Sequence, residues 1–153
     1  MIKILIENGN EPLVKKTAGI LKREYIKRHA GESIIVSLNT SKTIEKEGFN
    51  IEGKDVILVD DLIDTAGTIC KAAILLKEKG ANSVRAVCTH PVLSGAAYEN
   101  LEQSELVEIA VTDTIPLKKN ISRIKVLSMS DLFAKAIRKI HDHESISSLF
   151  IRL

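Results

Sequence analysis

VILVDDLIDTAGTI, residues 56–69, holds in direct succession an apolar run, two adjacent carboxylates and a small flexible turn. The run at residues 56–59 has the β-branched composition of a buried strand, and Asp60 and Asp61 follow at its expected end. Gly67 then allows backbone freedom where a helix is expected to begin. The stretch therefore predicts a strand, a loop and a helix, with acidic side chains where the strand ends.

The same alternation of patterns extends in both directions along the chain. Aliphatic and β-branched runs predict strands at residues 2–6, 33–38, 55–59, 83–88, 106–111 and 123–128. Helical spacing of apolar residues predicts helices at residues 13–28, 68–79, 95–103 and 130–141. Gly80 is the expected stop of the second helix. Alternating strands and helices predict an α/β fold, with a mainly parallel central sheet and helices on both faces.

Length and composition narrow the class of protein. A chain of 153 residues with 44% hydrophobic residues is the size of one domain with a real core. The 22 basic and 20 acidic side chains nearly cancel, which argues against a nucleic-acid or membrane-surface partner. No apolar run approaches the roughly 20 residues of a membrane span, and Cys70 and Cys88 match no metal or redox spacing. These features predict a cytoplasmic protein with reduced thiols.

The acids and the turn suggest a ligand with two chemical ends. In a parallel sheet, ligands bind beyond the carboxyl ends of the strands, and the free amides of a starting helix attract phosphate. Asp60 and Asp61 would repel a dianion, so they suit a neutral or cationic group, such as a cis-diol with Mg²⁺ beside it. A ribose 5-phosphate unit has both ends. Asp64 and Thr65 are also common helix caps, and that alternative stays open for them.

The quoted residues resemble a known family. VILVDDLIDTAGT is similar to the phosphoribosyl-pyrophosphate (PRPP) signature of type I phosphoribosyltransferase folds, in the form carried by ribose-phosphate pyrophosphokinases, or PRPP synthetases. CTHPVLSG and SMSDLFAKAIRKIHDHESISSLF extend the likeness to that family's C-terminal domain over residues 53–150. The resemblance implies a phosphoribosyltransferase-like domain that belongs to nucleotide biosynthesis and is of transferase type. Ribose 5-phosphate or PRPP would bind with Mg²⁺ that accompanies the substrate.

The resemblance also assigns roles to residues. Asp60 and Asp61 would hold the ribose hydroxyls. The 5-phosphate would be wrapped by the residues that follow: Asp64, Thr65, Ala66, Gly67 and Thr68. It assigns no catalytic residue and no protein ligand for a metal.

The first third of the chain departs from the family pattern. Residues 1–55 resemble the start of the family's N-terminal half, so we hypothesise that residues 1–153 form one domain that joins the two halves, by deletion or by design. RHAGE, residues 28–32, replaces the adenine-contacting Phe-Ser-Asp-Gly-Glu of the family, and only Gly31 and Glu32 match. The Arg-Gln pair, the metal-binding His and the Lys-Arg-Arg loop have no counterpart, apart from Lys42. The resemblance therefore implies a ribose-phosphate half-site without ATP recognition, impaired or inactive alone.

Two alternatives to a diphosphokinase-type domain remain. A PRPP-dependent phosphoribosyltransferase would need a base-recognising segment, which we do not find outside residues 1–50. A non-catalytic regulatory, assembly or engineered single-domain protein would bind ligand without turnover. The resembled enzyme has subunit contacts near the SLF end, residues 148–150, so a homo-oligomer is expected.

Overall fold

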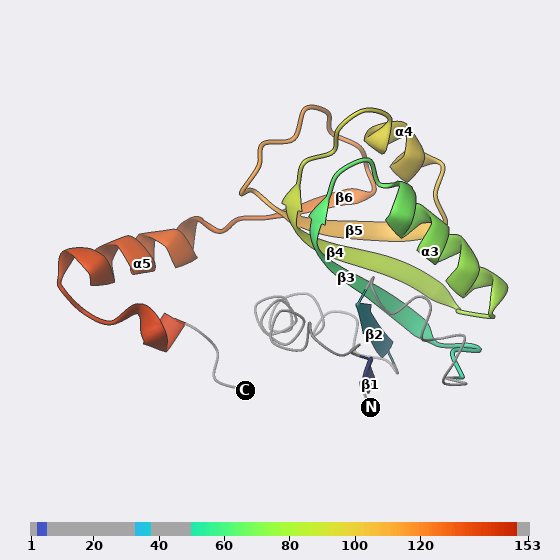
Figure 1. Ribbon diagram of the computed structural model, residues 1–153, viewed down its shortest axis with the longest axis horizontal. Coiled ribbons are helices and arrows are strands. Elements are labelled where there is room, and N and C mark those ends of the chain that lie inside the picture. The colour runs from blue at the N-terminus through green and yellow to red at the C-terminus, as the bar shows by residue number, and fades with distance from the viewer. Residues whose placement is uncertain (1–2, 6–32, 38–49, 150–153) are drawn as a thin grey trace.

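A six-stranded parallel sheet runs through the molecule in the order β1-β2-β3-β4-β5-β6 (Figure 1). This computed structural model describes residues 3–5, 33–37 and 50–149, with side chains for residues 50–149. The strands are β1 Lys3–Leu5, β2 Ser33–Ser37, β3 Asp55–Ile63, β4 Ser83–Pro91, β5 Leu106–Thr112 and β6 Ile124–Leu127. The predicted α/β fold with a parallel sheet is confirmed.

Two of the described helices connect neighbouring strands. α3 is Gly67–Glu78 and α4 is Ala97–Glu102. Parallel strands joined by right-handed crossovers that all advance in one direction place their helices on the same face, and α3 and α4 do pack into one cluster with the sheet. Gly80, at φ 89°, follows α3 as predicted. The helix predicted at residues 13–28 lies outside the described residues.

The chain leaves the sheet after β6. α5, Ser130–His141, matches its predicted bounds, extends away from the sheet and has no buried residue (Figure 1). A short 3₁₀ helix follows at Ile146–Leu149. The described part of the chain contains no candidate for a membrane-spanning helix.

β3 and β4 continue further than the sequence pattern predicts. Pairing of Asp60 with Cys88 and of Ile63 with Pro91 carries both strands past their apolar runs. The prediction that Asp60 and Asp61 follow the end of the strand is therefore wrong, because both lie inside β3. The described pairing of β2 with β3 stops at Val59, so the two acids belong to a part of β3 that pairs with β4.

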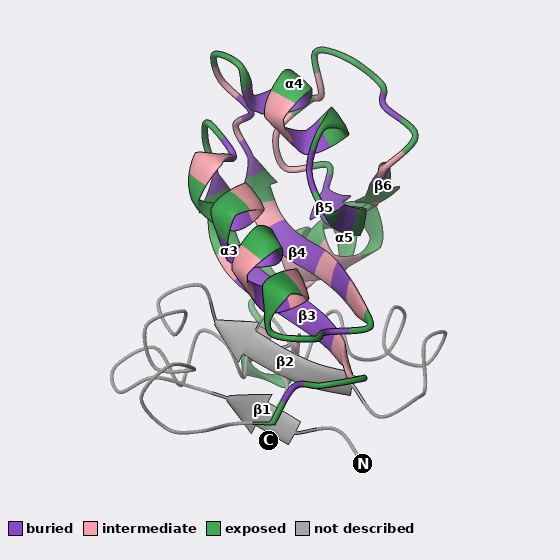
Figure 2. Cartoon of the chain, turned by 90° about the vertical axis from the view of Figure 1, so that its right-hand side faces the viewer, coloured by how far each residue is buried: buried purple, intermediate pink, exposed green. Residues whose placement is uncertain are grey.

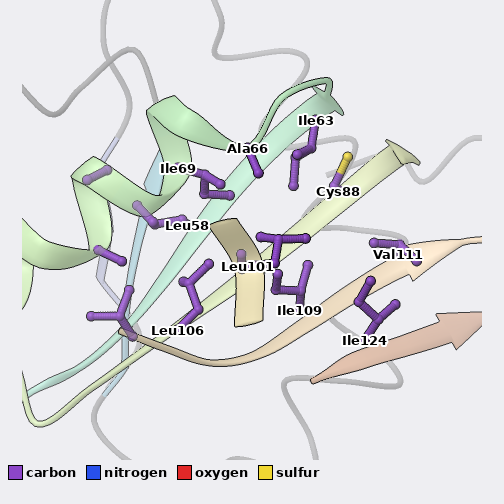
Figure 3. Packing of buried hydrophobic residues seen from close by; sticks show 14 of the residues in the cluster. Leu58, Ile63, Ala66, Ile69, Cys88, Leu101, Leu106, Ile109, Val111 and Ile124 are labelled. Atoms are coloured by element: carbon purple, nitrogen blue, oxygen red, sulfur yellow. The ribbon is translucent and has the colours of Figure 1, made fainter. Parts of the chain in front are cut away.

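Alternating side chains of the strands form two buried clusters. The larger one joins Leu58 of β3, Ile69 of α3 and Leu101 of α4, among others (Figure 3). The smaller one, on the opposite face, contains Ile57, Val59, Val87 and Ala110. Both faces of β3 and β4 are therefore buried along much of their length (Figure 2), as expected for a parallel sheet.

Replacement of Leu58 by alanine tests this core. Leu58 is 1% exposed beneath α3, so Leu58→Ala is expected to lower the free energy of unfolding by about 2–5 kcal/mol through lost burial and a residual cavity. Ile74 of α3 is 45% exposed, and Ile74→Ala serves as the control with an expected change of less than about 1 kcal/mol. Urea denaturation of both variants measures the difference. Equal losses in the two variants would contradict the assignment of Leu58 to the core.

Candidate functional site

A pocket of about 230 Å³ lies where β3 passes into α3. Its lining residues are Asp60, Leu62, Ile63, Asp64, Thr65, Ala66, Gly67, Thr68 and Ile69. The pocket thus brings together six of the seven predicted site residues. The seventh, Asp61, is exposed beside it, and its backbone N–H donates to Asp60 Oδ1 at 2.9 Å.

The start of α3 supplies amide donors to this pocket. The first described hydrogen bond of the helix runs from the Cys70 N–H to the Ala66 carbonyl at 3.1 Å. The amides of Gly67, Thr68 and Ile69 precede it, and none of them donates to an acceptor within residues 50–149. Such amides, together with the positive end of the helix dipole, favour an anion.

No side chain caps the helix. The N-cap residue is Ala66, which has a left-handed backbone (φ 62°) and makes no side-chain cap bond. Asp64 instead accepts a hydrogen bond from the Ser94 hydroxyl, and the Ser94 N–H donates to the Asp64 carbonyl at 3.0 Å. Asp64 therefore links the loop to the segment after β4, and the capping role left open for Asp64 and Thr65 is not the one adopted.

Partial burial raises the pKa of the acid that lines the pocket. Desolvation raises the pKa of Asp60 to about 6, and the neighbouring Asp61 carboxyl adds to this through a hydrogen bond and charge repulsion. Two backbone amides, those of Asp61 and Leu62, act in the opposite direction without cancelling the rise. A donor hydroxyl or a cation bound here would favour the ionised form of Asp60.

These carboxylates also suit a shared cation. Within residues 50–149, no three His, Cys, Asp or Glu side chains are grouped so that they could hold a metal by themselves. Mg²⁺ commonly uses one or two carboxylates and completes its shell with water and substrate oxygens. Asp60 and Asp61 would hold such an ion through their oxygens, and its charge would offset the repulsion between them.

Neighbouring polar groups have other partners. His90 Nδ1 lies 3.0 Å from the Thr114 hydroxyl, which itself donates to the Thr89 carbonyl at 2.9 Å. His90 is therefore hydrogen-bonded to the turn after β5 and does not line the pocket. Burial raises the pKa of Cys88 to about 12, which argues against a thiolate nucleophile there.

Sequence reasoning missed two residues that support the loop. Ser94 binds Asp64, and Asn100 Nδ2 donates to the Thr65 carbonyl at 2.9 Å. Ser94 lies within the CTHPVLSG motif, so a signal for its importance existed. Asn100 lies on α4, 35 residues from Thr65, and no sequence pattern links the two.

Comparisons with known proteins show which family the chain resembles. The pattern of the phosphoribosyl synthetase-associated domain matches residues 28–151. Ribose-phosphate pyrophosphokinase from Campylobacter jejuni is 52% identical over 138 residues, which cover 87% of this chain and 45% of that protein. The Wolinella succinogenes protein of the same name is 51% identical over 138 residues, with the same two coverages. The chain spans less than half the length of these relatives.

A solved structure supports the same relationship. The phosphoribosylpyrophosphate synthetase of Mycobacterium smegmatis aligns with a TM-score of 0.70 and 25% identity, over 93% of this chain and 58% of that one. The chain therefore belongs to the phosphoribosyl synthetase-associated domain family.

Proposed function

We propose that the pocket between β3 and α3 binds the ribose 5-phosphate unit of ribose 5-phosphate or PRPP. The observation that carries this proposal is that one pocket is lined both by Asp60 and by residues 64–68, which lead into the start of α3. Relatives at about half identity are ribose-phosphate pyrophosphokinases, whose name states a ribose-phosphate substrate. The pocket lining and the names of the relatives thus support the same class of ligand, a ribose phosphate.

Each end of the pocket suits one end of the ligand. The loop amides would donate to the phosphate, with hydrogen bonds to a charged group worth about 1.5–3 kcal/mol each. Asp60 and Asp61 would accept hydrogen bonds from the ring hydroxyls, which a carboxylate pair can do without a cationic side chain. Mg²⁺ that arrives with the substrate would share these carboxylates.

The proposal separates ligand binding from turnover. Residues 28–32 match only Gly31 and Glu32 of the five adenine-contacting positions of the family that they resemble. We therefore expect this chain alone to bind ribose 5-phosphate without making PRPP from ATP. A cytoplasmic setting and a homo-oligomer are part of the same proposal. The exposed apolar side chains of α5, Phe133, Ile137 and Ile140, support self-association.

A titration of the wild-type chain with ribose 5-phosphate, PRPP and ATP, each with Mg²⁺, tests the proposal. Calorimetry is expected to show binding of the first two ligands and none of ATP. Tight ATP binding, or AMP release with ribose 5-phosphate, would contradict the separation of binding from turnover. Absence of ribose 5-phosphate binding would refute the proposal itself.

Removal of the acid pair tests the role of the carboxylates. Asp60→Ala combined with Asp61→Ala is expected to weaken ribose 5-phosphate binding at least about 100-fold, because two charge-assisted hydrogen bonds are lost. The control is Glu102→Ala with Glu105→Ala, which removes the same charge from exposed positions outside the pocket. If the two carboxylates acted only by repelling the phosphate, their removal would instead strengthen ribose 5-phosphate binding. Equal affinity in the acid-pair variant and the wild type would rule out this role.

The raised pKa of Asp60 predicts a pH dependence. Because its pKa is about 6, Asp60 ionises as the pH rises through that value, and acceptance of ring hydroxyls should improve. The ligand's phosphate also titrates near about pH 6, so the reference is the Asp60→Asn variant, which retains only the ligand's contribution. Calorimetry between about pH 5 and pH 7 is expected to show a steeper rise in affinity for the wild type. Parallel profiles would show that Asp60 does not contact the sugar in its ionised form.

A further inference from the structure

Three consecutive carbonyls, at the end of β3 and in the loop before α3, accept hydrogen bonds from the same neighbouring part of the chain. The Ile63 carbonyl accepts from the Leu93 N–H at 3.1 Å, and the Asp64 carbonyl accepts from the Ser94 N–H at 3.0 Å. The Thr65 carbonyl accepts from Asn100 Nδ2 at 2.9 Å. All three donors belong to the connection between β4 and α4 or to α4 itself. Two of them are main-chain groups, and Asn100 is the one that depends on the identity of a side chain.

Because a peptide unit is planar, each of these hydrogen bonds also fixes the direction of the N–H group in the same peptide unit. All described peptide bonds are trans, so the N–H of each plane points opposite to its carbonyl. A carbonyl fixed toward the β4–α4 connection therefore directs the following N–H, on Asp64, Thr65 or Ala66, away from it. The pocket is lined by these three residues and by none from the connection. Three amides that point away from the connection, on residues that line the pocket, are available to form a backbone nest for an anion.

The strain at Ala66 makes external support necessary. A left-handed backbone at a residue other than glycine costs about 1–2 kcal/mol, and Ala66 has φ 62° without a side-chain cap. Strained residues persist only where their surroundings hold them. Asn100 holds the peptide plane between Thr65 and Ala66 by its hydrogen bond to the Thr65 carbonyl. On the other side of Ala66, the Cys70 N–H donates to the Ala66 carbonyl.

We propose that Asn100 is a positioning residue for the phosphate of the ligand: by holding the Thr65 carbonyl, it aims the Ala66 N–H into the pocket. This inference rests on the proposed function, since it needs a phosphate in that pocket. Asn100 itself does not line the pocket, so its role would be indirect. Ser94 assists because its hydroxyl donates a hydrogen bond to Asp64 Oδ1. This bond engages one oxygen of a carboxylate that would lie near the phosphate dianion.

Amide-to-alanine and amide-to-acid exchanges in the full chain test the role of Asn100. Asn100→Ala removes the donor without adding charge, and Asn100→Asp removes it while keeping the side-chain volume, so either variant suffices if the other does not fold. Gln103→Ala and Gln103→Glu are the matched controls, because Gln103 is an exposed amide that follows α4. Asn100→Ala is expected to bind inorganic phosphate and ribose 5-phosphate about tenfold more weakly, the value of one ordinary hydrogen bond, and Asn100→Asp at least as weakly because it also adds a negative charge. The Gln103 controls are expected to match the wild type.

A second readout separates positioning from general stability. In ¹H–¹⁵N spectra without ligand, the Ala66 amide is expected to shift in the Asn100 variants and to stay in place in the Gln103 controls. Wild-type affinity in a folded Asn100 variant would overturn the positioning role, while ribose 5-phosphate binding by the wild type would leave the proposed function intact. A wild type that binds neither phosphate nor ribose 5-phosphate would overturn both.

Discussion

The parallel ladder between β3 and β4 is the constraint on which the site depends. It continues from Val59 to Ile63, past the last described pairing with β2. This extension carries Asp60 to the start of α3, and it places the segment after β4 beside the loop after β3. Without the extra pairs, the acids would belong to a free loop, and the three carbonyls at residues 63–65 would lack their common set of donors.

The ladder also explains why the two ends of the pocket differ chemically. The strand side presents a partly buried carboxyl whose pKa is raised by desolvation, whereas the helix side presents main-chain N–H groups. A ligand with hydroxyls at one end and a phosphate at the other satisfies both sides. The carboxylates of Asp60 and Asp61 would repel a ligand that consisted of phosphate alone. A neutral sugar alone would offer no anionic group to the main-chain amides. The pairing of the two ends is more informative than either feature by itself.

Sequence patterns predicted the elements well and the contacts between them poorly. The bounds of α5 and the stop at Gly80 followed from periodicity and from local backbone preference. The end of β3 did not, because Asp60 and Asp61 break the apolar pattern while the ladder with β4 continues through them. Ser94 and Asn100 act on residues 30 and 35 positions away, and only the folded chain brings such partners together. The common face of α3 and α4 likewise depends on strand order, which no local pattern encodes.

The central claim is that main-chain amides bind the phosphate while the paired acids bind the sugar. A crystal structure of this chain with ribose 5-phosphate and Mg²⁺ tests it most directly. The account predicts phosphate oxygens within hydrogen-bond distance of the amides at residues 65–68, with ring hydroxyls or the cation on Asp60 and Asp61. A phosphate bound elsewhere, or one held at the acids with the loop amides turned away, would contradict it.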